Sequence, residues 1–271
     1  MLERDHFELV LSRHRGNEYL SKWLHKSDPR RLLQSIGRYV YFNSVFGGGV
    51  ANLAGEISVR HVLFCDPEEA ITSIRDRSVA IAADIFSAAV DEFGDRSTQN
   101  RFTHRALAQA TIKGIGGYFG YHPSDIDNII SPNEATCIAV ERVKDGYLLS
   151  QKPDDHKIFE GIGFHLSSEI LADSEFRTID SYLQTRHPEL VLYLRKNRIM
   201  IGDSALPAYA WIQIHTHVEI DHFHSAVQGA NKALRYYSGQ EDRDVIKAWI
   251  MDGFVSFAHV QKDFLKYLGE D

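Results

Sequence analysis

Cysteine and long apolar runs are scarce in this sequence. Of its 271 residues only Cys65 and Cys137 are cysteines, which excludes a disulfide framework and leaves no spacing suited to a thiolate metal site. No apolar run approaches the ~20 residues of a membrane span, and the first residues lack the apolar stretch of a signal peptide. We therefore expect a protein of the reducing cytoplasm with no membrane as a partner.

Blocks of lysine and arginine are also missing. The net charge of -7 comes from dispersed carboxylates, so no basic surface is available to neutralise a row of phosphates. Nucleic acid is therefore not the expected partner, and a small molecule is. With 44% hydrophobic and 25% charged residues, the composition is that of a folded chain with a packed core.

Period-two alternation is rare, and apolar residues recur at three- and four-residue spacing, which predicts an all-α fold. The seven prolines fall between the periodic segments, and the clearest breaks are at 47–49 and 94–97. No linker, repeat or low-complexity segment divides the chain, so we expect one domain over 1–271. The predicted helices are 3–25, 29–44, 48–63, 68–93, 101–119, 132–150, 154–184, 188–196, 206–238 and 241–268.

Histidine is the residue type present in excess, with 14 copies, four of them between 215 and 224. At about 100° per residue, His217, Asp221 and His224 fall within an arc of about 60° on one helix face. Three ligands therefore converge on one point. Two imidazoles and a carboxylate on neighbouring turns suit a divalent ion such as iron, manganese or zinc.

The same spacing occurs a second time on the opposite face of this helix, at His215, Glu219 and His222. A lone histidine on a helix is more often a surface or core residue than a ligand. Six ionisable groups within ten residues, however, would be costly beside an apolar core without metals or charge partners. We therefore expect one set to bind metal, and helix geometry alone leaves open which.

Three further ligand candidates lie on other helices. Glu92 and His104 each share a helical stripe with apolar residues, so both should point inward, with Glu92 ending one helix and His104 starting the next. Glu169 lies in the mostly apolar segment 163–173, where a salt-bridged or exposed role is an equal alternative. Three carboxylates and three histidines together form a natural ligand set for two divalent ions in a helix bundle.

The predicted metal ligands, which are also the predicted catalytic residues, are Glu92, His104, Glu169, His217, Asp221 and His224. This order resembles that of the heme-oxygenase-like diiron oxidases, relatives of the pyrroloquinoline quinone synthase and thiaminase-like helical folds, over roughly 30–240. The resemblance implies a heme-oxygenase-like bundle of about seven core helices. It also selects the His217 face, because the ligand order of that family ends in His, Asp, His.

The resemblance further implies two Fe(II) ions, with manganese as the alternative metal, and dioxygen as co-substrate. The expected function is a non-heme diiron oxidase or oxygenase acting on an amino acid, an amine or a fatty acid. An external electron donor and a homodimer are left open. The competing readings are a metal-independent oxidase or thiaminase-like enzyme on the same fold, and a non-catalytic helical metal-binding module.

Two features depart from the pattern or extend it. The interval from Glu169 to His217 is longer than in the family pattern, and we expect the segment 185–207 to form an added hairpin or lid. Arg235 lies about three turns beyond His224 on the same face, where it could receive a substrate carboxylate, although surface solvation is its plainer role. A seventh ligand cannot be placed, and Glu56 and His61, which are near the region, are expected to be structural.

Overall fold

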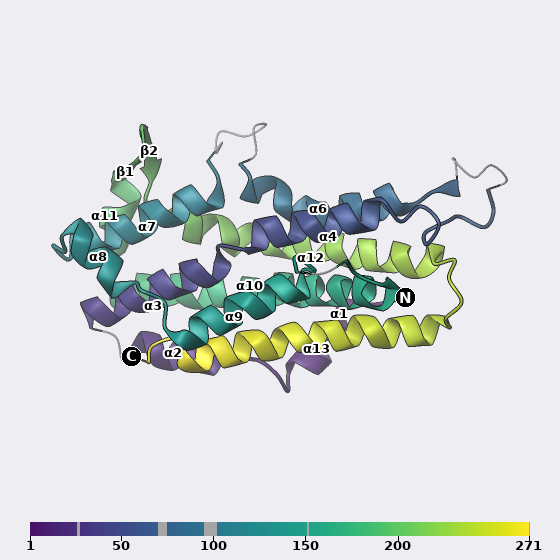
Figure 1. The fold of residues 1–271 in the computed structure, drawn as a ribbon. Coiled ribbons are helices and arrows are strands. Elements are labelled where there is room, and N and C mark those ends of the chain that lie inside the picture. The colour runs from purple at the N-terminus through teal and green to yellow at the C-terminus, as the bar shows by residue number, and fades with distance from the viewer. Residues whose placement is uncertain (26–27, 70–74, 95–101, 151, 271) are drawn as a thin grey trace.

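The computed structural model describes residues 1–25, 28–69, 75–94, 102–150 and 152–270, which are predominantly helical (Figure 1). This confirms the all-α prediction for the described residues, in which one two-stranded sheet is present. No helix in this part of the chain has the length and apolar character needed to cross a membrane. The helices are α1 (Arg4–Leu11), α2 (Asn17–His25), α3 (Pro29–Asn43), α4 (Phe46–Ser58), α6 (Ser78–Glu92), α7 (His104–Tyr118), α8 (Pro123–Ile129), α9 (Glu134–Gly146), α10 (Asp155–Arg186), α11 (Pro188–Lys196), α12 (Ala210–Tyr236) and α13 (Arg243–Tyr267).

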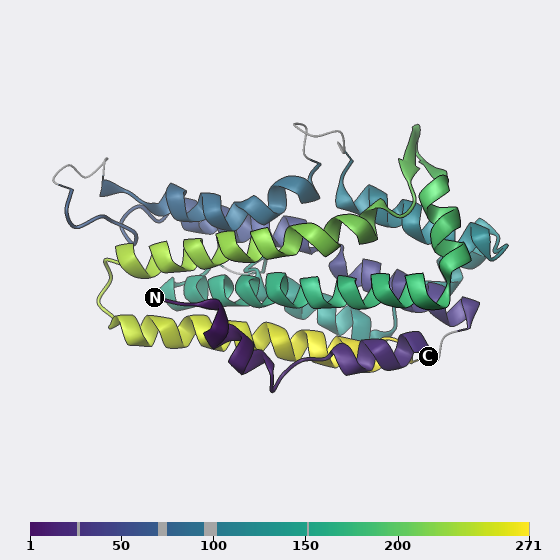
Figure 2. The same cartoon turned by 180° about the vertical axis from the view of Figure 1, so that it is seen from behind.

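Three long helices, α10, α12 and α13, run side by side along the molecule, with α10 in the middle (Figure 2). Every residue of α10 from 161 to 171 is buried. A helix that is buried on all sides must be packed against neighbours all round. Gly163 and Gly253 allow α10 and α13 to approach closely, because a Cβ at either position would lie within 2 Å of a backbone oxygen of the other helix. These helices form the frame that carries most of the candidate ligands.

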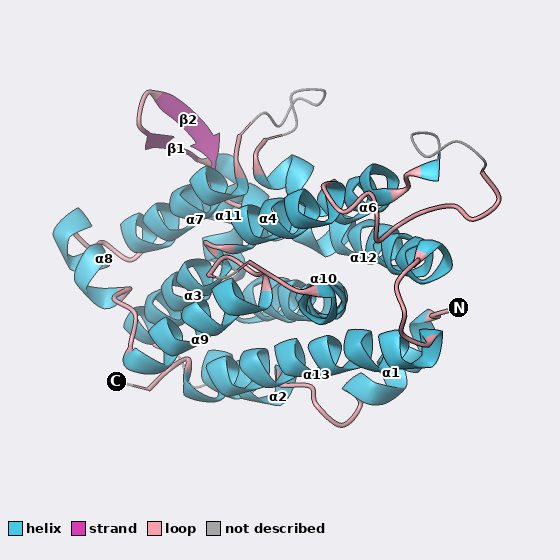
Figure 3. Ribbon diagram, turned by 45° about the vertical axis from the view of Figure 1, so that its right-hand side comes forward, coloured by secondary structure: helices cyan, strands magenta, loops and turns pink. Residues whose placement is uncertain are grey.

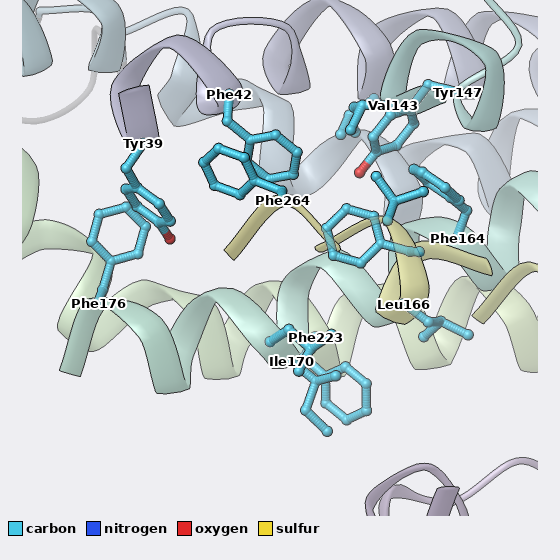
Figure 4. Packing of buried hydrophobic residues seen from close by; sticks show 14 of the residues in the cluster. Tyr39, Phe42, Val143, Tyr147, Phe164, Leu166, Ile170, Phe176, Phe223 and Phe264 are labelled. Carbon is cyan, nitrogen blue, oxygen red and sulfur yellow. The ribbon is translucent and has the colours of Figure 1, made fainter. Parts of the chain in front are cut away.

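Aromatic side chains join α3 to this frame (Figure 4). Phe42 of α3 stacks on Phe264 of α13 at a centroid distance of 4.1 Å, and Tyr39 meets Phe176 of α10 edge-on at 5.5 Å. Such pairs add to the free energy gained by burying the rings. They fix the position of α3 against α10 and α13, beside the candidate site.

The segment 185–207 contains α11 followed by a β-hairpin, whose strands are β1 (Arg198–Ile201) and β2 (Ser204–Pro207). The strands are antiparallel, with Ile201 paired to Ser204, and Gly202 in the turn has a positive φ of 56° that glycine adopts at little cost. Figure 3 shows the hairpin projecting from the bundle beside α7. The hairpin predicted for this segment is therefore present.

The N-terminal segment differs from its prediction. Instead of one helix over 3–25, the chain forms α1 and α2, which are separated at 12–16. Gly16 lies in this break, and a Cβ there would be 3.0 Å from the Cα atom of Lys262 in α13. The close approach of the chain to α13 therefore decides where the helix is interrupted, and a periodicity argument cannot detect it.

The glycine run 47–49 is also not the predicted break, because α4 begins at Phe46 and continues through it. Glycine costs up to about 1 kcal/mol relative to alanine inside a helix, so three in succession suggest a loop. Packing overrides that preference here. A Cβ at Gly49 would lie 2.7 Å from the ring of Tyr147, so the small residue lets α4 sit against α9.

Candidate metal centre

The buried face of α12 carries His215, Glu219 and His222. His215 and Glu219 are 5% and 4% exposed, and the side chain of His222 is 15% exposed. Trp211 and Ala226, which continue the same stripe in the two directions along the helix, are buried. Because a helical turn has 3.6 residues, this spacing keeps all five on one face. The apolar face of α12 therefore holds three ligand-type side chains inside the bundle.

The set that the resemblance selects lies on the other side of α12. His217, Asp221 and His224 are exposed, and the exposed Gln213 and Gln228 continue their stripe. The structure does not bring these three residues to the other predicted ligands, whereas it brings His215, Glu219 and His222 to them. The reason is elementary: a stripe flanked by polar residues faces water, and one flanked by apolar residues faces the core.

Glu92, His104 and His215 form the first cluster of ligand atoms. Glu92 is the last residue of α6 and His104 the first of α7, as the sequence predicts. Glu92 Oε1 lies 3.0 Å from His104 Nδ1 and 3.8 Å from His215 Nε2, and ligand atoms of all three residues lie within 4.8 Å of one another. A carboxylate at the negative end of a helix dipole gains from a nearby cation. Two imidazoles and one carboxylate suit a divalent ion of intermediate softness.

Glu169, Glu219 and His222 form the second cluster, again with ligand atoms within 4.8 Å of one another. His222 Nδ1 lies 3.5 Å from Glu169 Oε2 and 3.7 Å from Glu219 Oε2. Glu169 is 7% exposed, which excludes the exposed role that the sequence left as an alternative. Two carboxylates beside the same imidazole cost free energy to bury unless a cation is present.

Glu219 belongs to the surroundings of both clusters. Its Oε2 atom is the one beside His222, and its Oε1 atom lies 3.8 Å from His215 Nε2 in the first cluster. The two oxygens of a carboxylate can each serve a different ion. The two clusters are therefore halves of one site, with Glu219 between them.

The protonation states of the carboxyls reflect this crowding. Burial raises the pKa of Glu92, but the His104 and His215 imidazoles outweigh it and bring the pKa to about 2. Burial likewise opposes ionisation of Glu169, and the His165 and His222 imidazoles still hold its pKa below the ordinary value. Burial and the charge of Glu169 raise the pKa of Glu219 well above its ordinary value, although His222 opposes this. Without a metal, a proton on Glu219 neutralises its negative charge beside Glu169. A bound cation could neutralise that charge instead.

His215 is fixed in one orientation by its neighbours. Its Nδ1 atom lies 2.6 Å from the carbonyl oxygen of Trp211, so this nitrogen donates and Nε2 is left as the acceptor that faces Glu92. The ring stacks on Phe176 at a centroid distance of 4.1 Å and an angle of 15°. Burial lowers the pKa of His215, which favours the neutral form that binds metals.

A series of buried polar side chains contacts Glu169 outside the ligand clusters. His165 Nδ1 lies 3.3 Å from Glu169 Oε1 and 3.3 Å from the hydroxyl of Tyr147, which is 2.7 Å from Ser168 Oγ. Such outer groups orient a carboxylate and tune its basicity. His165 and Tyr147 were not singled out from the sequence, although His165 lies four residues before Glu169 in the same apolar segment.

Two cavities adjoin the site. The inner one, of about 40 Å³, is lined by five of the six ligand-type residues, all except His104, together with side chains of α3, α4 and α13. The outer one, of about 380 Å³, lies between α3 and α7 and reaches Glu92, His104 and His215. Asn43, Glu92 and His215 line both cavities. A small molecule can therefore approach the first cluster from the outer cavity, with its reacting part near the inner one.

Gly47 brings α4 against the first cluster. A Cβ at this position would lie 3.0 Å from the Cβ atom of Glu92 and 3.6 Å from its Oε2 atom. The neighbouring Gly48 is exposed, and a Cβ there would meet nothing within 4 Å. These two glycines therefore form a matched pair, one against the site and one facing away from it.

We expect Gly47→Ala to displace Glu92 and to weaken metal binding about tenfold or more, because ligands must be held within fractions of an ångström. Gly48→Ala should leave the affinity unchanged and stabilise the helix by about 0.5–1 kcal/mol. Titration with Mn(II) and thermal unfolding measure the two effects. Equal metal affinity in both variants would show that α4 does not position Glu92.

The remaining predicted residues lie away from the site. Arg235 is exposed at the end of α12, ~30 Å along the helix from His215, and its guanidinium lies over the ring of Tyr236. It lines neither of the two cavities, so the predicted contact with a substrate at this site is not supported. Glu56 lies 3.8 Å from Arg60, and His61 is exposed, which fits the structural roles expected of them.

Comparisons with protein-family models, with curated proteins and with solved structures found no match to this chain. The function of the site must therefore be inferred from its own geometry and from the ligand pattern of the sequence.

Proposed function

We propose that this chain is a dimetal oxidase or oxygenase that uses dioxygen on a small organic substrate. The observation that carries the proposal is a pair of three-ligand clusters, joined by Glu219, of which five of the six residues line the inner cavity. Two histidines with one carboxylate is the ligand set of many non-heme Fe(II) oxygenases. Carboxylate-rich sites contributed by several helices are typical of dimetal oxidases built on helix bundles.

The residues of the site fit two divalent ions. Their donors are three imidazoles and three carboxylates, which suit iron, with manganese as the alternative. Two ions would carry +4 against -3 from the carboxylates. The raised pKa of Glu219 indicates that the metal-free cluster holds more negative charge than its burial tolerates. Cations at the two clusters would remove this cost.

The ligand order of the chain supports the same function. With the buried face of α12 in place of the exposed one, the order is Glu92, His104, Glu169, His215, Glu219, His222. The spacing of the last three equals that of the diiron-oxidase pattern, with glutamate where those proteins have aspartate. We extend the proposal to the fold: a single domain of the heme-oxygenase-like type, in which α6, α7, α10 and α12 supply the ligands.

The side chains around the site have different roles in the proposed reaction. Two ferrous ions, when bound, would supply the electrons and the Lewis acidity that the reduction of dioxygen requires. His215 presents a neutral nitrogen because its other nitrogen donates to Trp211. Glu219 holds the two clusters together. Phenylalanines 42, 46, 176 and 257 line the inner cavity and give it an apolar surface.

Dioxygen uptake tests the proposed activity. Anaerobic protein loaded with two equivalents of Fe(II) should consume dioxygen when it is mixed with a suitable substrate, and metal-free protein should not. Glu219→Ala should lower the rate by more than the roughly 10–100-fold that follows loss of an outer-shell partner. Asp221→Ala, on the exposed face of the same helix, is the matched control and should behave as the wild type.

The other outcomes separate the competing functions. Dioxygen-dependent or hydrolytic turnover by metal-free protein would contradict the proposal and favour a metal-independent enzyme on the same fold. Iron binding without uptake for any amine, amino acid or fatty acid tested would favour a non-catalytic metal-binding module.

A further inference from the structure

Besides the ligand clusters, the polar lining of the inner cavity includes Glu175 of α10 and Gln261 of α13, which we call the Glu175–Gln261 wall. The two residues are 2% and 1% exposed. One oxygen of each, Oε1 in both residues, is buried and has no hydrogen-bond partner among the described residues. A buried polar atom without a partner is costly, and native proteins rarely leave two beside one cavity. A hydrogen-bonding ligand in the cavity would remove this cost.

The orientation of Glu175 is fixed by its other oxygen. Tyr39 donates its hydroxyl proton to Glu175 Oε2 at 2.6 Å. Tyr39 itself is held edge-on to Phe176 at 5.5 Å and stacked on Phe264 at 6.3 Å, and Figure 4 shows Tyr39 beside Phe176. The carboxyl thus cannot turn away from the cavity without losing this bond. Burial raises the pKa of Glu175 to about 8, and because Oε2 accepts from Tyr39, the proton of the neutral carboxyl lies on Oε1. Oε1 becomes an acceptor when a cationic ligand displaces that proton.

Aromatic rings make up most of the apolar lining of the inner cavity. Rings attract a cation at their faces, most strongly where water is excluded. The aromatic residues lining the cavity are Tyr39, Phe42, Phe46, Phe176 and Phe257. A carboxyl, an amide oxygen and several rings around one small space favour a positively charged donor over an anion.

We propose that the Glu175–Gln261 wall binds the ammonium group of the substrate, which is therefore a primary aliphatic amine. An ammonium group has three donors and no acceptor, so it satisfies both orphan oxygens. A substrate carboxylate in the same place has no hydrogen-bond donor, so it could bond neither to Gln261 Oε1 nor to an ionised Glu175. This inference rests on the proposed function, because it names the substrate class of that site, and it excludes fatty acids bound head-first.

The dimensions of the cavities agree with an amine that reaches in from outside. The inner cavity of about 40 Å³ accommodates a small head group. The outer cavity of about 380 Å³, which shares Asn43, Glu92 and His215 with it, accommodates the rest. Apart from the cluster residue Glu92, the charged residues that line the outer cavity are one cation and one anion, Arg105 and Asp127, so they favour neither sign of ligand charge. The Glu175–Gln261 wall alone therefore determines the substrate class. An amine bound there would have the carbon atoms next to its nitrogen beside the ligand clusters.

Calorimetric titration of the full chain tests this, with n-hexylammonium, 1-hexanol and hexanoate as probes in the metal-free and the Mn(II)-loaded protein. Hexylammonium should bind about tenfold or more tightly than hexanol, and hexanoate more weakly still. Glu175→Gln and Gln261→Leu should each weaken hexylammonium binding by roughly tenfold or more. Asp173→Asn, which removes a carboxylate on α10 that pairs with Arg177, is the control and should have no effect.

Hexanoate or hexanol binding as tightly as hexylammonium would overturn the inference, and so would absence of binding by all three, which would mean that water satisfies the wall. Thermal unfolding of each variant shows that a lost affinity is not a lost fold. Metal binding without amine binding contradicts this inference alone. Amine binding by a protein that takes up no metal contradicts the proposed function alone.

Discussion

Alanine at His215, Glu219 or His222 is expected to abolish the binding of at least one of two metal ions, whereas alanine at His217, Asp221 or His224 leaves both. The two sets have the same residue spacing on the same helix, so they differ in the face they occupy and in one residue, glutamate in the buried set and aspartate in the exposed one. His222→Ala should affect the second cluster alone. Glu219→Ala should affect both ions, because Glu219 contacts His215 with one oxygen and His222 with the other.

Metal content after anaerobic loading with Fe(II) and desalting, measured by mass spectrometry, gives the number of ions per chain. The exposed set is the control for loss of charge and of helix propensity. Loss of metal from the His217→Ala or His224→Ala variant, with retention by His215→Ala, would contradict the assignment of the site to the buried face of α12.

A second large effect is expected from Glu175→Gln, on stability rather than on metal binding. Burial raises the pKa of Glu175 from about 4.5 to about 8, although the hydrogen bond from Tyr39 opposes the shift. Between these two pH values the folded chain therefore holds a proton that the unfolded chain has released. Its stability should fall as the pH rises through this window, by up to about 1.4 kcal/mol per pH unit.

Glutamine cannot titrate and keeps an oxygen for the Tyr39 hydroxyl, so Glu175→Gln should lack this slope. We expect the metal-free variant to be more stable than the wild type at pH 8 by about 3–5 kcal/mol. The two proteins should have nearly equal stability at pH 5. Urea unfolding of both across this range isolates Glu175, because the other titrating groups are common to both proteins. Parallel curves would show that Glu175 titrates normally.

Much of the helical framework could be predicted from the sequence, because apolar periodicity and proline mark it. The segment Pro188–Lys196 is helical over the range expected, and α10 differs from its prediction by only a residue or two at each end. The structure differs from the prediction at 12–16, where a predicted helix is interrupted, and at 47–49, where a predicted break is helical. In both places a glycine is explained by the close approach of a helix distant in sequence, which local pattern does not contain.

The ligand face of α12 was predictable in principle. Trp211 and Ala226 continue the stripe of the His215 set, and Gln213 and Gln228 continue that of the His217 set, so hydrophobic periodicity alone separates inside from outside. The family pattern favours the other face because its fifth ligand is aspartate, as at position 221, and that pattern contains no information on burial.

Other parts of the site could not be foreseen. Glu175 lies on α10 at helical spacing from His165 and Ser168, but nothing in the sequence indicates that Tyr39 of α3 donates to it. Nor does the sequence place Gln261 of α13 beside it. These contacts depend on how the helices pack. The order Glu92, His104 and Glu169, by contrast, was recognisable because each residue interrupts an otherwise apolar stripe.

Anomalous diffraction from crystals of the full chain loaded with Fe(II) or Mn(II) tests the central claim most directly. At the absorption edge of the metal, the account predicts two peaks about 3.5–4 Å apart. One should lie among Glu92, His104 and His215, and the other among Glu169, Glu219 and His222. Peaks on the exposed face of α12 at His217 and His224, or no peak within the bundle at saturating metal, would contradict it.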